Sequence, residues 1–138
     1  AFGSIEHVTI ECLRNIPRDR IQRSTQCFSL SQRIDLIVEL LETESDTQFS
    51  NLSVLLLRAK ELAKTRNLIA HNPLVLEVYE HTNGGFMFKE TIASLLKKRQ
   101  RISFHELETF ANESERLASD LYDYSVKVFN ALEKPDHK

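Results

Sequence analysis

Apolar residues recur at the three- and four-residue spacing of an α-helix along most of this chain. The first such stretch, residues 4–16, is closed by Pro17, which lacks the amide hydrogen that a helix interior needs. A second stretch covers residues 20–42. Ser29 and Ser31 are suitable N-cap residues inside it, so we expect either one helix there or two shorter pieces.

The clearest apolar stripe lies in a third helix, expected over residues 50–71 after a polar connector at 42–48. This helix must end near His71, because Pro73 disfavours helical dihedrals at the residue before it. The stripe consists of Leu52, Leu55, Leu56, Ala59, Leu62 and Ala63.

After the third helix the pattern of apolar positions changes. Residues 74–81 and 85–89 are rich in Val, Tyr and Phe, and Asn83-Gly84 between them is typical of a type I′ turn in a β-hairpin. Ser103 and Glu106 then match a capping box that opens a long helix, reaching about residue 132. We therefore predict an all-α fold in a single domain, residues 1–138. It is an antiparallel bundle of four to five helices with a small β-hairpin inserted before the last long helix.

Charge and composition narrow the classes of function. The formal net charge of −2 gives no overall attraction for nucleic acid or an anionic membrane, so a polyanion would need a local basic site. No apolar run reaches the length of a transmembrane helix, and we expect a cytoplasmic protein without membrane contact. The histidines and the two cysteines, Cys12 and Cys27, lack metal-ligand spacing, so we expect no metal and no other cofactor.

The end of the third helix carries the most informative residues. From Leu62 and Ala63, the next position on the apolar stripe is Arg66, so a cation continues an apolar face. Asn67 and His71 are four residues apart and share one side of the helix. Arg66 and His71 are roughly 140° apart on an ideal helix, so a long arginine side chain or an altered last turn must bring their heads together.

Arg66 has two interpretations from spacing alone. In the first, Arg66 forms an internal ion pair with Glu6, Asp35 or Glu39, and His71 caps the helix. In the second, a guanidinium, an amide and an imidazole converge on an accessible surface and form a site.

The pattern Arg66-Asn67-x-x-x-His71, at the end of the third helix of a small bundle, resembles the Arg-polar-x(3–5)-His motif of the HEPN-domain family. The opening Phe2-Gly3-x-Ile5-Glu6 and the continuation through Asn72-Pro73 are also similar to members from bacterial defence and toxin systems. The resemblance covers most of the chain as architecture, and few specific residues carry it.

This resemblance implies a metal-independent endoribonuclease in which two protomers bring their motif helices together at a shared site. Arg66 would hold the scissile phosphate and stabilise the charge of the transition state. His71 would act as the general acid or base, and Asn67 would orient the histidine or donate to phosphate. Glu6, an acidic residue in an early helix, would support the site by pairing with Arg66 when no RNA is bound.

Two basic runs are candidate contacts for the RNA backbone, or solvated surface charge. The looser run consists of Arg14, Arg18, Arg20 and Arg23. The shorter run, which we assign to RNA binding, consists of Lys97, Lys98, Arg99 and Arg101.

The expected partners are therefore RNA, a second copy of the chain in a homodimer, and an antitoxin or another protein in a defence, stress or toxin–antitoxin context. The alternative is a non-catalytic helical module of the same fold that binds a protein or nucleotide partner. Both interpretations need the same scaffold, so the sequence leaves them open. An unrelated helical bundle is a third interpretation.

Overall fold

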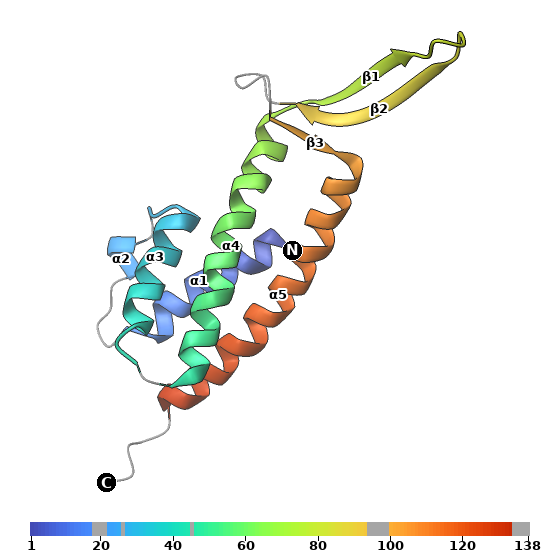
Figure 1. Cartoon of the computed structure of the whole chain (residues 1–138). Coiled ribbons are helices and arrows are strands. Elements are labelled where there is room, and N and C mark those ends of the chain that lie inside the picture. The colour runs from blue at the N-terminus through green and yellow to red at the C-terminus, as the bar shows by residue number, and fades with distance from the viewer. Residues whose placement is uncertain (18–21, 26, 45, 94–99, 134–138) are drawn as a thin grey trace. The chain divides into compact units, whose positions relative to one another are not determined.

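The computed structural model describes residues 1–17, 22–25, 27–44, 46–93 and 100–133 (Figure 1). The described residues are mostly helical and also form a small antiparallel sheet. The helices are α1 (Phe2–Asn15), α2 (Gln22–Thr25), α3 (Leu30–Leu41), α4 (Thr47–His71) and α5 (Phe104–Glu133). The strands are β1 (Leu74–Glu80), β2 (Phe86–Ala93) and β3 (Arg101–Ser103).

The chain divides into two compact units. Unit 1 comprises Ala1–Ala63 and Glu113–Lys138, and unit 2 comprises Lys64–Asn112. Helices α4 and α5 each continue from one unit into the other, so the motif residues at the end of α4 belong to unit 2.

Unit 1 is a helical bundle whose core is built from the apolar faces of α1, α3, α4 and α5 (Figure 1). The buried positions in each helix recur every three or four residues, which is why these helices form a common core. The core side chains include Ile5, Val8, Cys12, Ile34, Ile37, Leu52, Leu56, Ala59, Leu121 and Val128.

Polar contacts connect the helices of unit 1. The buried hydroxyl of Thr9 in α1 accepts a hydrogen bond from Arg33 Nε of α3 at 3.1 Å, and Arg33 Nη1 also donates to the carbonyl of Phe28 at 3.2 Å. Lys60 of α4 forms an ion pair with Asp35 of α3 at 2.7 Å. These contacts fix which side of α3 faces α1 and α4.

The second helical stretch is broken, which was one of its two expected forms. Ser29 is the N-cap of α3, and its Oγ accepts from the amide of Gln32 at 3.3 Å. Gln32 Oε1 accepts from the amide of Ser29 at 2.9 Å, which completes a capping box. Ser31 lies inside the helix and is not the cap.

Unit 2 contains a three-stranded antiparallel sheet in the order β1-β2-β3. The mostly helical fold and the predicted hairpin before the last long helix are confirmed, and β3 adds a third strand to the sheet. Three residues are too few to show an alternating pattern, so β3 left no signal in the sequence. The sheet registers Leu74 opposite Ile92 and Ile92 opposite Ile102, and both isoleucines are buried.

The type I′ turn expected at Asn83-Gly84 is wrong. That turn needs a positive φ at two successive residues, whereas in the described chain only Gly84, at φ 85°, has one. The connection has three residues, because the His81 amide donates to the Gly85 carbonyl at 2.6 Å and the Gly84 amide to the His81 carbonyl at 3.0 Å. This pattern fits a type I turn followed by a left-handed glycine, the usual three-residue hairpin loop.

Candidate functional site

The motif residues lie in the last two turns of α4, where the buried stripe of that helix gives way to solvent. Ala63 is buried, but Arg66, Asn67 and His71 are all exposed. Asn72 Nδ2 donates to the Leu68 carbonyl at 2.7 Å, which satisfies one of the carbonyls left unpaired where the helix ends before Pro73. The motif therefore sits at a well-defined, accessible helix end.

The guanidinium of Arg66 contacts Asn67. Arg66 Nη1 donates to Asn67 Oδ1 at 3.3 Å, so the cation and the amide are already associated. Asn67 and His71 are one turn apart on the same side of the helix. Among the described residues no hydrogen bond joins Arg66 to His71. This is expected, because the two side chains leave the helix in directions roughly 140° apart.

The internal ion-pair interpretation of Arg66 gains no support from its exposure. An arginine kept to neutralise a core carboxylate is normally buried with it, whereas Arg66 is exposed. Asp35, one of the three carboxylates considered, pairs instead with Lys60. Glu6 is a half-buried residue of α1 in unit 1, and its role beside Arg66 stays a prediction.

An open hollow of about 380 Å³ lies in unit 2 beside the motif. Its lining residues are Lys64, Thr65, Leu68, Gln100 and Arg101. Lys64 and Leu68 alternate with Asn67 and His71 at a spacing of three and four residues, so the four side chains project from neighbouring rows of α4. The basic groups of the hollow, Lys64 and Arg101, thus belong to the same unit as the motif.

The sequence missed this hollow. Lys64 has the three- and four-residue spacing that places it on the same side of the helix as Asn67 and His71, so its position near the motif could be predicted. Gln100 and Arg101 are more than thirty positions further along the chain, and only the sheet brings them to α4. No short-range pattern could have linked them.

The predicted RNA-binding run is only partly described. Lys97, Lys98 and Arg99 lie outside the described residues. Arg101 lines the hollow, and its Nη1 is paired with Glu77 Oε1, so its charge is partly neutralised. RNA binding by this run stays a prediction.

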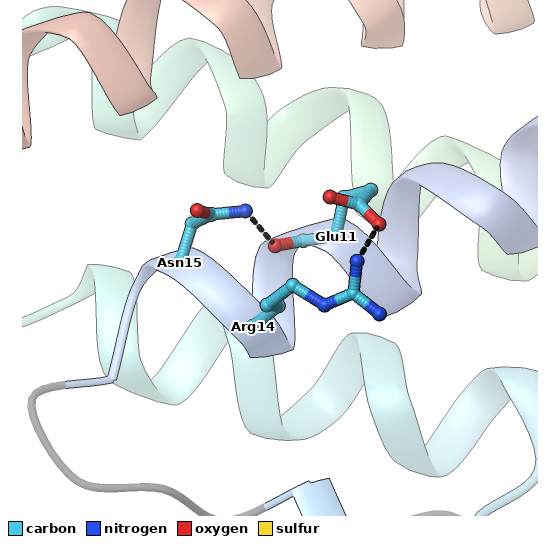
Figure 2. A network of polar contacts seen from close by, with 3 residues as sticks. All are labelled: Glu11, Arg14 and Asn15. Carbon is cyan, nitrogen blue, oxygen red and sulfur yellow. Dashed lines mark hydrogen bonds and ion pairs between the residues drawn. The ribbon is translucent and has the colours of Figure 1, made fainter.

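The looser basic run is represented by Arg14, the one member whose side chain is described. Figure 2 shows that Arg14 Nη1 donates to Glu11 Oε1 at 2.9 Å, and that Asn15 Nδ2 donates to the Glu11 carbonyl at 2.8 Å. Arg14 is thus partly neutralised within its own helix. Arg18 and Arg20 lie outside the described residues, as does the side chain of Arg23.

The two cysteines are free thiols in different surroundings. Cys12 is fully buried in the core of unit 1, and burial, with a smaller effect of Glu11, raises its pKa from 9.0 to about 12. Cys27 is exposed. Cys12 therefore acts as a small apolar core residue and not as a nucleophile.

The described residues hold no group of three His, Cys, Asp or Glu side chains placed to bind a metal ion. Within the same part of the chain, none of the helices combines the length and apolar character needed to cross a membrane.

No protein-family model, no curated protein and no solved structure matches the chain. A function must therefore be argued from the residues at the end of α4.

Proposed function

We propose that the chain is a metal-independent endoribonuclease of the HEPN type, whose active site forms where the α4 ends of two protomers meet. The observation that carries this proposal is the exposure of Arg66, Asn67 and His71 together in the last two turns of α4. A guanidinium can stabilise the charge of the phosphate in the transition state, and an imidazole can transfer a proton, so both groups suit metal-independent cleavage of RNA.

Each residue has a distinct chemical role in this reaction. The 2′-oxygen of a ribose attacks the adjacent phosphorus, its proton passes to a base, and the bond from phosphorus to the 5′-oxygen breaks. His71 serves as that base or protonates the leaving 5′-oxygen, and such proton transfer contributes about 10²–10⁴ to the rate. Arg66 stabilises the negative charge that builds up on the phosphate oxygens. Asn67, held by Arg66, orients the groups.

The geometry of one protomer favours a site shared between two. Arg66 and His71 point in directions roughly 140° apart, so one phosphate is reached more easily by Arg66 of one chain and His71 of another. Ala59 and Ala63 are buried inside unit 1, whereas Ala70, one turn after Arg66, is exposed and available to a partner. Small Ala70 allows two such helices to approach closely.

The test is cleavage of a single-stranded RNA by purified protein in excess EDTA. We expect products that end in a 2′,3′-cyclic phosphate, and no cleavage at a 2′-deoxy position, because the 2′-oxygen is the nucleophile. His71→Ala and Arg66→Ala should each lower the rate by about 10²-fold or more.

The matched control is His105→Ala, which removes another exposed histidine of unit 2. It should cleave like the unmodified protein, and all variants should keep their helical circular dichroism. Cleavage that survives unchanged in both motif variants would refute the proposal.

A non-catalytic module that binds a protein partner is the second candidate. The exposed apolar side chains of the β1-β2 hairpin, including Leu76 and Phe88, favour it. Protein that leaves structured and unstructured RNAs intact would support this candidate against the ribonuclease.

A further inference from the structure

The β1-β2 hairpin exposes apolar side chains on one face. Cross-strand partners share a face, so the register places Leu74, Leu76 and Val78 of β1 with Phe86 and Phe88 of β2. These side chains expose between 54% and 66% of their surface. Together they present an apolar patch on the order of 500 Å², which is as large as the patches that mark interaction sites on monomers.

Among the described residues, no strand covers the outer edge of β1. In the described part of the chain β1 pairs with β2 alone, and it has no bulge, no proline and no lysine to block further pairing (Figure 1). Proteins normally protect an edge strand with such features, because its unpaired backbone groups can join another strand. The charges of β1 are Glu77, which is paired with Arg101, and Glu80 next to the turn, so the stretch around Leu74 and Leu76 is able to pair with another strand.

The hydrogen bonds of the hairpin show which backbone groups are available. The His81 amide donates to Gly85, and the Ala93 amide donates to the carbonyl of Pro73 at 3.4 Å. Alternate residues of β1, with odd numbers, thus turn their backbone groups toward β2. The amides and carbonyls of Leu74, Leu76 and Val78 face the open edge, and the same residues carry the exposed apolar side chains.

We propose that the open edge of β1 pairs antiparallel with β1 of a second copy of the chain, with the two-fold axis beside Leu76. Leu76 then lies opposite Leu76 of the other copy, and Leu74 lies opposite Val78 on either side. Three apolar cross-strand pairs form, and each shields part of the exposed face.

Charge and apolar contacts favour this register over the registers shifted toward the hairpin turn. A two-fold axis at Glu77 would set two carboxylates directly opposite each other, which is destabilising. An axis at Val78 would place Leu76 opposite Glu80 and leave one apolar pair. The axis at Leu76 places Glu77 opposite Val75, so it avoids the opposed carboxylates and keeps three apolar pairs.

The charge of the hairpin also argues against RNA as the occupant of this edge. Its strands carry Glu77, Glu80 and Glu90 against a single Lys89, so the surface repels a phosphate backbone. The patch falls below the roughly 800 Å² that each partner buries in a standard interface. We therefore expect association that is weak and depends on protein concentration in the micromolar range.

This contact is separate from the proposed ribonuclease site. His71 is five residues before Leu76, so the two His71 side chains would lie on the order of 30 Å apart along the paired strands. The edge pairing therefore brings the motifs of these two copies no closer, and it can be tested independently of RNA cleavage.

The first test is the mass of the full chain by analytical ultracentrifugation from low to high micromolar concentration. We expect the mass of the unmodified protein to rise with concentration. Leu76→Lys should reach a lower mass at the same concentration, because only the α4 contact of the proposed function remains. The introduced lysine would lie opposite Glu90 within the hairpin, so the variant should fold. The matched control is Val54→Lys, at an exposed aliphatic residue of α4, which should associate normally.

The second test fixes the register by cysteine cross-linking in a Cys27→Ser background. Leu76→Cys should cross-link two copies, because directly opposite Cα atoms lie about 5.5 Å apart. Val78→Cys should not, since the two sulfurs would be offset by four residues, roughly 13 Å. A protein that stays monomeric, a Leu76→Lys variant with the same mass as the unmodified protein, or cross-linking through Val78→Cys in place of Leu76→Cys would each overturn the proposal.

Discussion

At the scale of single residues, solvent exposure distinguishes the roles of two arginines, Arg33 and Arg66. Arg33 is half-buried and donates to Thr9 and to a backbone carbonyl, so its charge serves the fold. Arg66 is exposed and contacts Asn67 within its own helix. A cation that continues a buried stripe without neutralising the core is available for a ligand, and this is why the proposed chemistry centres on Arg66.

The buried thiol of Cys12 gives a prediction about pH. Its pKa is raised to about 12 in the folded state, against 9.0 in the ordinary case, because burial disfavours the thiolate. Above pH 9 the unfolded chain loses this proton while the folded chain keeps it. The contribution to stability is therefore full at neutral pH and is lost as the pH rises from 9 toward 12.

Urea unfolding at a series of pH values checks this. We expect the free energy of unfolding to fall more steeply with alkaline pH in the unmodified protein than in Cys12→Ala. The Cys27→Ser variant is the control and should follow the unmodified protein, since Cys27 is exposed. Identical slopes for all three proteins would contradict the assignment.

At the scale of elements, the link between α1 and α3 gives a matched pair of arginine substitutions. Arg33→Ala removes hydrogen bonds from a charged donor to the buried Thr9 and to Phe28, and should cost about 1.5–3 kcal/mol of stability. Arg14→Ala removes an exposed ion pair within α1 and should cost about 0.2–0.5 kcal/mol. Chemical denaturation measures both, and equal losses would show that the α1–α3 link is not specific.

The elements that the sequence predicted well are those with a local cause. The long helices follow from apolar spacing, and the end of α4 from Pro73. The break before α3 follows from Ser29, which forms its capping box with Gln32. The hairpin follows from the alternation of apolar residues. The turn type predicted from Asn83-Gly84 is wrong, because loop length depends on strand register, which the dipeptide does not encode.

Features that depend on residues far apart in the chain could not be predicted from the sequence. The hollow in unit 2 needs Lys64 and Arg101, which are far apart in the sequence. The ion pair of Arg101 with Glu77 neutralises part of the positive charge that the sequence predicts for the basic run ending at Arg101. To identify the backbone groups at the open edge of β1, one must know which alternate residues of β1 bond to β2, and the sequence alone does not give this.

At the scale of the whole molecule, the chain presents two candidate contact surfaces, the exposed end of α4 and the edge of β1. Each would pair with the same surface of another copy, as two-fold contacts do. Two such contacts on one protomer would build assemblies larger than a dimer. Leu76→Lys should then reduce the mass of the assembly while the ribonuclease site, which needs the α4 contact, stays intact.

The shared site itself is tested by mixing two inactive variants. If Arg66 of one protomer works with His71 of the other, a mixed dimer of Arg66→Ala and His71→Ala has one site with both groups and one with neither. Random exchange makes about half of the dimers mixed, so the mixture should recover about one quarter of the unmodified rate. Each variant alone should stay inactive, and the double variant mixed with unmodified protein is the control for exchange. If Arg66 and His71 act within one protomer, mixing restores nothing, and the proposal of a site formed between two α4 ends fails even if the protein cleaves RNA.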